Sequence, residues 1–324
     1  MPVNSPLVHS RRIDPWLLEL LRCPITGGGL LEDGNALSTT IANGPRYEIT
    51  ATGLPLFAQS SLSEDGLKQQ AHYDRIAKDY LANLGYPHTQ EYMAALDRSL
   101  LSCVSPNSLG TTAEICCGRG EAFHLLQDRI QCGVGVDVSV SMLEAAQTEH
   151  QRRPIRFVQG DATMLPLRSA AFDNVFMLGG IHHVSDRPQL FFEIERILKP
   201  GGTFYFREPV SDLALWRWMR AVIYRLSATL DHETERPLRH CEVAPLLENS
   251  GLRLTQWATH GFLGFCLFMN SDVLIFNRSF RFVPGIRRIT RFFAKLDNWA
   301  LGLPGMHNAG LQVIGKAEKP AAAR

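Results

Sequence analysis

The stretch from residue 111 to residue 206 alternates short apolar segments with amphipathic ones. The apolar segments TTAEICC, GVGVDV, IRFVQGD and FDNVFMLGG have the length and composition of buried strands. Between them, EAFHLLQDRI and SVSMLEAAQTEH have helical spacing. This alternation predicts βαβ units, and therefore a parallel sheet with helices on both faces. Ligands bind such sheets at the carboxyl ends of the strands, so polar residues at those ends are the candidates for function.

A tight glycine turn, in the segment EICCGRGEAF, follows the first predicted strand. Gly118 and Gly120 let the chain turn and let a ligand approach the backbone, and the next helix directs free N–H groups to the same place. Neither common phosphate motif is complete. Phe123 stands where a dinucleotide fingerprint needs glycine, and the Gly-Lys-Ser/Thr of a P-loop is missing. Glu121 would also repel a pyrophosphate here.

Acidic residues end the next two predicted strands. Asp137, at the end of GVGVDV, can accept both hydroxyls of a ribose, a role that carboxylates have in nucleotide-binding α/β folds. Asp161, in GDATMLP, can accept from the exocyclic amine of adenine. A glycine turn, a ribose acceptor and an adenine acceptor without a phosphate clamp predict a site for an adenosine that carries no phosphates.

Residues 70–206 resemble the class I S-adenosylmethionine-dependent methyltransferases, of the type that acts on small molecules. The segments EICCGRG, GVDVSVSMLEAA, GDATMLPLRSAAFDNVF and HHVSDRPQLFFEIERILKPGGTFYF match the motifs of that family in order. The resemblance implies a Rossmann-like α/β fold with a seven-stranded sheet and helices on both faces. It also implies S-adenosyl-L-methionine as cofactor. The family has glycine at the position of Cys116. Cysteine can replace glycine there where φ is negative, so we expect a negative φ at this residue.

The resemblance assigns cofactor-binding roles along these segments and to one residue before them. Tyr73, in HYDRIAKDYL, is implied to lie on a helix that covers the methionine end of the cofactor, whereas its spacing alone is also typical of a core helix. The implied cofactor-binding residues are Tyr73, Glu114, Cys116, Cys117, Gly118, Gly120, Asp137, Val138, Met142, Asp161, Ala162 and Leu178.

Two pairs of histidines are candidates for a catalytic base. Methyl transfer requires a nucleophile in line with the departing sulfur, and a base is needed only where the acceptor must lose a proton. His182 and His183, in GGIHHVSD, follow the fourth predicted strand, and histidine exchanges protons near neutral pH. A packing role for either ring is the alternative. His232 and His240 form a second pair of candidates.

Residues 1–60 are predicted to form a small N-terminal module. PWLLELLRCP has helical spacing, and RYEITATGLPLF alternates like a strand and ends in a Gly-x-Pro turn. The segment resembles the zinc-ribbon-like modules found beside some methyltransferases, but the further ligands of that family are missing. Because one thiol cannot complete a zinc site, we expect no metal and a buried Cys23.

Residues 61–324 are assigned to the methyltransferase domain, with helical cap elements at about 208–240 and 260–309. The first is predicted as an amphipathic helix around Trp216. The second, between the predicted sixth and seventh strands, is rich in Phe and Arg, which favours either a cap over the substrate or a peripheral contact with a membrane. The cap residues expected to line an apolar acceptor pocket are Phe262, Phe265, Phe268, Phe276, Phe280, Phe292, Phe293 and Trp299.

Composition argues against several classes of protein. The chain has 33 Lys and Arg residues against 32 Asp and Glu, and this net charge of +1 gives no support for a nucleic-acid partner. Its 7 cysteines form no CxxC pair, which argues against a disulfide framework. The first residues lack the apolar core of a signal peptide, and no long apolar run follows, so we expect a cytoplasmic location.

The leading hypothesis is an enzyme that transfers a methyl group from S-adenosylmethionine to an apolar small molecule, such as an aromatic, polyketide or lipid-like acceptor of biosynthesis. An RNA methyltransferase is a second hypothesis, because some of those enzymes place a zinc ribbon before this fold. A catalytically silent homologue retained for binding is the third. The acceptor atom, the substrate, the oligomeric state and any partner of the N-terminal module are not determined by the sequence.

Overall fold

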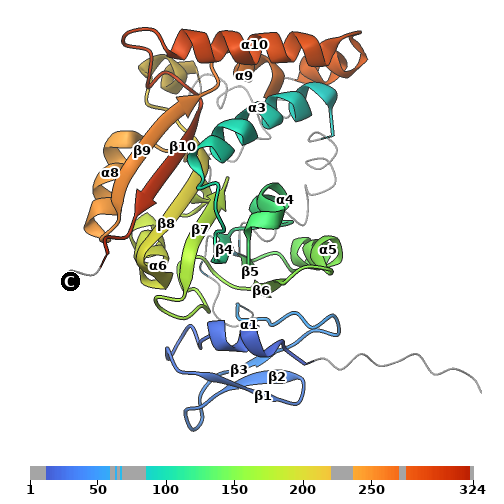
Figure 1. Cartoon of the computed structure of the whole chain (residues 1–324), viewed down its shortest axis with the longest axis vertical. Helices are drawn as coiled ribbons and strands as arrows, with labels where there is room; N and C mark the ends of the chain where they lie inside the picture. The colour runs from blue at the N-terminus through green and yellow to red at the C-terminus, as the bar shows by residue number, and fades with distance from the viewer. Residues whose placement is uncertain are drawn as a thin grey trace, which may run out of the picture.

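A seven-stranded sheet with the order β6-β5-β4-β7-β8-β10-β9 forms the centre of the molecule (Figure 1). The computed structural model describes residues 12–58, 63, 66–67, 85–219, 236–269 and 275–321. The strands pair in parallel except β10, which is antiparallel to β8 and β9. The strands are β4 Thr111–Ile115, β5 Cys132–Asp137, β6 Ile155–Gln159, β7 Phe172–Leu178, β8 Leu198–Pro209, β9 Arg253–His260 and β10 Gln312–Glu318. The predicted Rossmann-like sheet is confirmed.

Helices cover both faces of this sheet. The helices α1, α6 and α8 contribute buried side chains to the core on one face, and α3, α4 and α5 do so on the other. Phe191 and Phe204 are fully buried on the first face, and Phe123 and Phe157 are buried on the second. The helices are α1 Pro15–Leu20, α3 Pro87–Cys103, α4 Glu121–Leu126, α5 Val140–His150, α6 Arg187–Ile197 and α8 His240–Asn249, with short 3-10 turns at η1 Gln127–Arg129 and η2 Ile181–His183.

Two of the helices begin at capping residues. Asp186 precedes α6, and its carboxylate accepts the N–H of Gln189 at 3.1 Å. Ser139 precedes α5, and its hydroxyl accepts the N–H of Met142 at 3.4 Å. Each cap satisfies a backbone donor that the first helical turn leaves free, so these starting points follow from local sequence.

The N-terminal residues form α1 and a small antiparallel sheet, β1 Leu30–Asp33, β2 Ala36–Thr39 and β3 Arg46–Glu48. Cys23 is fully buried, with its Sγ 3.0 Å from the hydroxyl of Tyr47 and 3.3 Å from the N–H of Thr26. The thiol therefore packs inside this module. In the described ranges, no three His, Cys, Asp or Glu side chains gather as a metal site would require. The domain boundary near residue 60 stays a prediction.

The end of the N-terminal module adds to the edge of the main sheet. Leu56 pairs in parallel with Gln159, the last residue of β6. The N–H of Phe57 donates to the carbonyl of Gln159 at 3.0 Å, and the N–H of Gln159 donates to the carbonyl of Pro55 at 2.9 Å. The carboxyl end of β6 is therefore covered rather than exposed as a free strand edge.

Helical segments between β9 and β10 form a cap over α3 at one end of the molecule (Figure 1). They are α9 Leu263–Met269, η3 Ile275–Phe282 and α10 Ile286–Leu301. Tyr92 and Leu96 of α3 are buried against Phe265, Phe268 and their neighbours in a third apolar cluster. The predicted insertion is thus helical and completes the packing of α3.

Asp297 is the polar centre of the cap. It lies on α10, is 2% exposed, and accepts the hydroxyl of Tyr92 from α3. It also accepts the N–H groups of Phe262 and Phe265 at 2.9 Å and that of Gly264 at 3.0 Å. One carboxylate therefore satisfies the free donors at the start of α9 and ties α3, α9 and α10 together.

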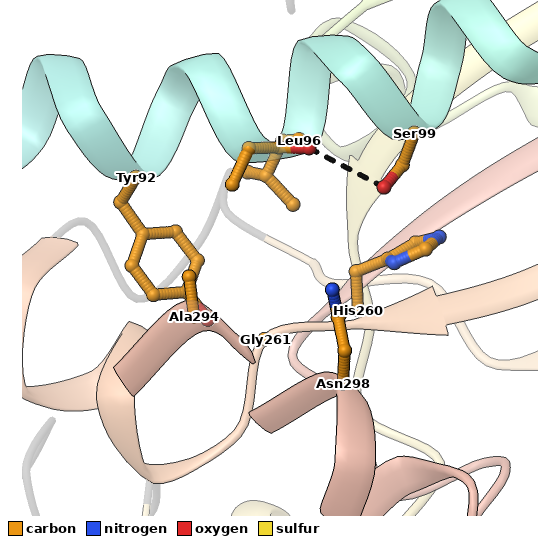
Figure 2. Close-up of a pocket in the computed structure, with 8 residues that line it drawn as sticks. Tyr92, Leu96, Ser99, His260, Gly261, Ala294 and Asn298 are labelled. Atoms are coloured by element: carbon orange, nitrogen blue, oxygen red, sulfur yellow. Dashed lines mark hydrogen bonds between the residues drawn. The ribbon is translucent and has the colours of Figure 1, made fainter. Parts of the chain in front are cut away.

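A cavity of about 10 Å³ lies between α3, the end of β9 and α10 (Figure 2). Figure 2 shows Tyr92 and Leu96 on α3, with His260 and Asn298 on the other side of the space. Such a volume holds about one water molecule. This cavity inside the cap is too small for an organic acceptor.

The expectation that all the cap aromatics line one pocket is wrong for Phe276, Phe292 and Trp299, which are 56%, 63% and 64% exposed. Phe265 and Phe268 are buried against α3 instead. A helical segment places residues on both of its sides, and composition alone does not say which side faces the protein. Removing the insertion would uncover the apolar side of α3.

The first predicted cap element is only partly described. Residues 214–219 are helical, and Trp216 is buried with its indole N–H donating to the carbonyl of Ala309 at 2.6 Å. Residues 220–235 lie outside the described residues, and so does His232.

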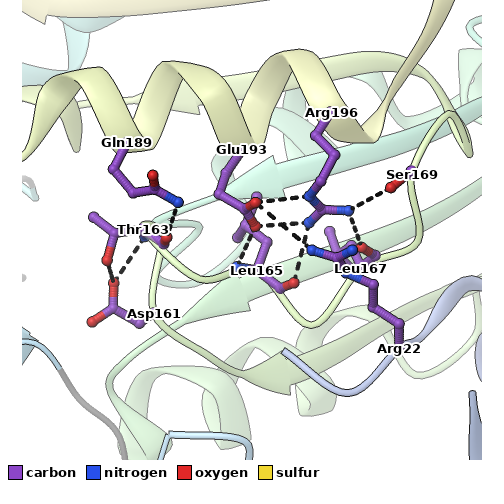
Figure 3. Close-up of polar contacts among 9 residues, drawn as sticks. All are labelled: Arg22, Asp161, Thr163, Leu165, Leu167, Ser169, Gln189, Glu193 and Arg196. Atoms are coloured by element: carbon purple, nitrogen blue, oxygen red, sulfur yellow. Dashed lines mark hydrogen bonds and ion pairs between the residues drawn. The ribbon is translucent and has the colours of Figure 1, made fainter. Parts of the chain in front are cut away.

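A buried ion pair on α6 holds the loop between β6 and β7 (Figure 3). Arg196 donates through Nε and Nη2 to the Glu193 carboxylate at 2.7 Å each, and to the carbonyls of Leu165 at 3.3 Å and Leu167 at 2.7 Å. Glu193 also accepts the N–H of Leu165 at 2.8 Å. On the other side of the loop, Arg22 of the N-terminal module lies 3.8 Å from Glu193.

Backbone hydrogen bonds join the same loop to the N-terminal module. The N–H of Arg22 donates to the carbonyl of Pro166 at 3.0 Å, and the N–H of Arg168 donates to the carbonyl of Leu20 at 2.8 Å. The loop that follows β6 is therefore fixed from α6 and from the module at once.

We expect Arg196→Ala to lower the free energy of unfolding by about 3 kcal/mol, because it leaves the Glu193 carboxylate buried without its main partner. Equilibrium unfolding in urea measures the change. Arg253→Ala is the matched control, since Arg253 is 72% exposed and its pair with Glu318 should contribute at most about 1 kcal/mol. Equal losses in the two variants would contradict the importance of the buried pair.

Candidate functional site

A buried glutamate fixes the glycine loop between β4 and α4. Glu114 is 1% exposed and accepts the N–H groups of Ala122 at 2.8 Å and Phe123 at 3.4 Å, in the first turn of α4. Burial raises the pKa of Glu114 to about 8, against the effect of these hydrogen bonds. Gly118 and Gly120 have φ of 50° and 81°, in the left-handed region that favours glycine. The loop is a defined turn in which Gly118 is half-buried and Gly120 is buried.

Cys116 has a φ of 52°, which corrects the expectation of a negative value. The turn into the glycine loop requires the left-handed conformation whatever the side chain is, and a residue other than glycine is strained by about 1 kcal/mol there. A Cβ placed on Gly180 would lie 2.6 Å from the Cβ of Cys116. The cysteine on one loop is therefore accommodated by a glycine on the loop after β7.

Burial and nearby carboxylates change the pKa of the Cys116 thiol. Burial raises the pKa of Cys116 well above its ordinary value, and the charges of Asp137, Glu208 and Asp161 raise it further. The thiol is therefore neutral and is a poor nucleophile. Cys116 itself lies between the glycine loop after β4 and the loop after β7.

Asp137 ends β5 and orders the loops on both sides of it. Its carboxylate accepts the N–H of Gly118 at 2.8 Å and the N–H of Ser139 at 2.9 Å. Burial raises the pKa of Asp137, and these N–H groups oppose the shift. Each carboxylate oxygen has a second lone pair that can accept a ligand hydroxyl. Met142 covers the glycine loop, since its Cε lies 3.5 Å from the place of a Cβ on Gly118.

Asp161 lies on the anchored loop after β6. It is 6% exposed and accepts the N–H of Ser63 at 2.9 Å, and the N–H and hydroxyl of Thr163 at 2.8 and 2.7 Å. Burial raises the pKa of Asp161, but the hydrogen bonds from Ser63 and Thr163 outweigh burial, so the net shift is downward. The carboxylate is therefore ionised at neutral pH, with Ser63 and Thr163 as its hydrogen-bond donors.

His182 is oriented by a buried glutamate. Its Nδ1 lies 2.7 Å from a carboxylate oxygen of Glu208, which is fully buried near the end of β8. Glu208 also accepts the N–H groups of Gly180 at 2.7 Å and Ile181 at 2.9 Å. Because a hydrogen on Nδ1 satisfies the carboxylate, Nε2 is left with the lone pair that a general base needs.

The two neighbouring histidines pack on one another. The ring centres of His182 and His183 lie 3.8 Å apart. The His182 ring also contacts the Glu208 carboxylate. The geometry therefore supports His182, which Glu208 orients, as the candidate base.

Glu208 and Arg207, in FREP at the end of β8, belong to this site although no sequence motif pointed to them. Arg207 is 5% exposed and contacts Asp97 of α3 and Glu121 of α4, each at 2.6 Å. Arg207 therefore neutralises the negative charge of Glu121, the charge that was expected to repel a phosphate ligand. Their place could have indicated them, because both residues lie at the carboxyl end of a strand, where such sheets bind ligands.

The remaining candidate residues lie in the core, at the surface, beside the strand-end loops or outside the described residues. Cys117 is 4% exposed, and a Cβ on Gly135 would lie 2.9 Å from its Sγ, so it packs in the core. His240 is exposed beside Trp257, with ring centres 5.1 Å apart. Tyr73 lies outside the described residues. The positions that are buried or half-buried near the loops are Val138, Ala162 and Leu178.

Sequence comparisons match the same part of the chain. The family described as "Methyltransferase domain" matches residues 113–206. The 2-phytyl-1,4-naphtoquinone methyltransferase of Synechocystis sp. is 31% identical over 169 residues, which cover 47% of this chain and 68% of the relative. The demethylmenaquinone methyltransferase of Lactococcus lactis is 37% identical over 95 residues, 28% of this chain and 38% of the relative. This second relative is matched over less than two thirds of its length.

Two solved structures share the fold at low sequence identity. The cyclase SpnF superposes with a TM-score of 0.56 at 18% identity, over 79% of this chain and 97% of its own. One chain of the complex between the Haloferax volcanii Trm112 methyltransferase activator and a methyltransferase gives a TM-score of 0.53 at 18% identity, over 79% and 99%. Since one neighbour is named a cyclase, the fold alone does not determine the reaction.

We expect Cys116→Gly to fold with equal or higher stability, because glycine relieves the left-handed strain at this residue. Cys116→Val should lose about 1–3 kcal/mol, since a β-branched side chain is poorly accommodated at positive φ. Urea unfolding of the two variants beside the wild type tests this order. A glycine variant less stable than the valine variant would show that the thiol contributes more by packing than it costs in backbone strain.

Proposed function

Because the chain belongs to the class I S-adenosylmethionine-dependent methyltransferases, we propose that it transfers a methyl group to an apolar aromatic or lipid-like small molecule. The observation that carries the proposal is that the glycine loop, which Asp137 holds at Gly118, meets the loop after β7, which Glu208 holds beside His182. The acceptor class is supported by two relatives, which are named as methyltransferases of a phytyl naphthoquinone and of demethylmenaquinone, both apolar quinones.

The residues present fit S-adenosylmethionine. Half-buried Gly118 lies beside Asp137, whose oxygens retain acceptor capacity for the ribose hydroxyls. Asp161, ionised on its anchored loop, would accept from the adenine amine. The glycine loop supplies no lysine for a phosphate, in agreement with a cofactor that carries none. When bound, S-adenosylmethionine supplies an activated methyl group on a sulfonium.

The His182–Glu208 pair supplies the remaining chemistry. A hydroxylated aromatic acceptor becomes a strong nucleophile when its hydroxyl loses a proton. His182 can take that proton at Nε2, while Glu208 holds the ring through Nδ1 and stabilises the imidazolium that results. The N–H groups of Gly180 and Ile181 keep the Glu208 carboxylate in place for this task.

We expect Asp137→Asn to weaken S-adenosylmethionine binding about 10- to 100-fold in isothermal titration calorimetry. A hydrogen bond to a charged acceptor contributes roughly 1.5–3 kcal/mol, and the amide loses both the charge and one acceptor oxygen. Asparagine is preferred to alanine because Asp137 also holds Gly118 and Ser139. Asp33→Asn, at an exposed position of the N-terminal module, is the control. Unchanged affinity would overturn the ribose assignment.

The function itself is tested with a reduced phytyl naphthoquinone or demethylmenaquinone dispersed in detergent. We expect S-adenosylhomocysteine and a methylated quinol in equal amounts, detected by mass spectrometry. RNA serves as the competing acceptor in a parallel reaction. Methylation of RNA and not of the quinols would support the rival function, and binding of S-adenosylmethionine without turnover of any acceptor would support a silent homologue.

In the same assay, His182→Gln should lower kcat by about 10²–10⁴-fold, the usual contribution of a general base. His183→Gln is the matched control and should change kcat much less. A His182 variant with the wild-type kcat would exclude a role as base.

A further inference from the structure

The outward face of α10 carries an apolar stripe, and no residue of the described segments buries it. Ile289, Phe292, Leu296 and Trp299 are separated by three, four and three positions, so they lie on one side of the helix. Phe292 and Trp299 are 63% and 64% exposed. Exposed Leu303 follows at the same spacing just beyond the helix. Large aromatic side chains in a row on a solvent-facing helix indicate a binding surface.

The opposite face of α10 already holds the helix to the protein. Its residues pack against α3 and α9, and Asp297 on this face binds the start of α9. The stripe is therefore not needed to attach the helix to the cap. The buried residues of α10 are Ile286, Thr290, Ala294, Asp297 and Leu301.

Cationic side chains border the stripe. The helix turns about 100° per residue, so Arg288 and Lys295 lie beside Phe292 and Trp299 on the exposed side. The one acidic residue in the α10 sequence, Asp297, is 2% exposed and faces the cap. The solvent-facing side of α10 thus combines apolar and positive groups without a carboxylate.

The turn before α10 extends this surface. Phe282 is 75% exposed, and the guanidinium of Arg281 lies 4.7 Å from its ring centre and 5.1 Å from that of Tyr86. Val283, the next residue, is exposed as well. An aromatic ring and an arginine therefore stand together at the beginning of the helix, as they do along it.

We propose that α10 and Phe282 dock the protein on an anionic lipid surface. In this arrangement the stripe enters the boundary between headgroups and acyl chains, and Arg288 and Lys295 contact lipid phosphates. The helix would lie in the interface, since none of the described helices has the length and apolar content to cross a bilayer. Figure 1 shows α10 across one end of the molecule and the N-terminal module at the other, so docking leaves the module in water.

A second copy of the chain fits the surface less well. The stripe has the spacing of a coiled-coil seam, in which flanking positions carry opposite charges that pair across the helices. Here the flanking positions hold Arg288 and Lys295 on one side and Phe293 and Ala300 on the other. A partner α10 would bring no exposed carboxylate to these cations, whereas anionic lipid supplies the missing charge.

The test is flotation of the full chain with vesicles of phosphatidylcholine alone or of phosphatidylcholine mixed with phosphatidylglycerol. We expect at least tenfold more protein on the anionic vesicles, and a loss of this binding at high salt. Phe292→Ser combined with Trp299→Ser, and separately Arg288→Glu combined with Lys295→Glu, should each reduce the bound fraction at least tenfold. These side chains are exposed, so the variants should keep the wild-type melting temperature and S-adenosylmethionine affinity.

Ile25→Ser combined with Leu31→Ser is the matched control, because these apolar residues are 53% and 59% exposed at the opposite end of the molecule. This control should bind vesicles as the wild type does. In addition, anionic vesicles should shift the tryptophan emission of the wild type to shorter wavelength, and Trp299→Phe should lack most of this shift. This second measurement needs no disruptive substitution.

Three results would overturn the proposal. The first is equal flotation with neutral and anionic vesicles, or none with either. The second is an equal loss in the Ile25 and Leu31 control, which would indicate general adhesion. The third is a dimer in light scattering that Phe292→Ser with Trp299→Ser disrupts, in the absence of vesicle binding, which would assign the surface to a second copy. None of these measurements depends on the identity of the methyl acceptor.

Discussion

Donation of backbone N–H groups to buried or half-buried carboxylates is the interaction on which the rest of this structure depends. Glu114 holds the start of α4, Asp137 holds the glycine loop, and Glu208 holds the turn that carries His182. Asp297 repeats the arrangement in the cap. Loops have free donors that helices and strands would satisfy internally, and a carboxylate satisfies two or three of them from one residue. Irregular segments thereby become fixed parts of the site.

The same carboxylates are the groups with which the site would act, so structure and function cannot be separated by deleting them. Asp137 would bind a ribose with lone pairs that its loop contacts leave free, and Glu208 would orient a base while it holds the backbone. Removing either side chain also releases a loop. Substitution by the amide, which keeps size and one acceptor, is therefore the more informative change.

The cap combines two tasks in one helix. The inner face of α10 completes the packing of α3 through Asp297 and its neighbours, and the outer face presents Phe292 and Trp299 beside cations. The two proposals together assign a purpose to this arrangement, because the apolar quinone-like acceptor proposed above would be dissolved in the bilayer. An enzyme that docks through its cap meets such an acceptor at the end of the molecule where the cap covers α3.

The sequence by itself determined the sheet, the glycine loop and the acidic strand ends, because apolar periodicity and turn residues act locally. It failed where the outcome depends on contacts between distant segments. The φ of Cys116 follows from the turn and from space left by Gly180, and the partner of His182 is 26 positions away at Glu208. Tertiary structure alone decided which side of α10 faces the protein and that Leu56 pairs with β6, since helical spacing and strand alternation fix a pattern but not the surface that it meets.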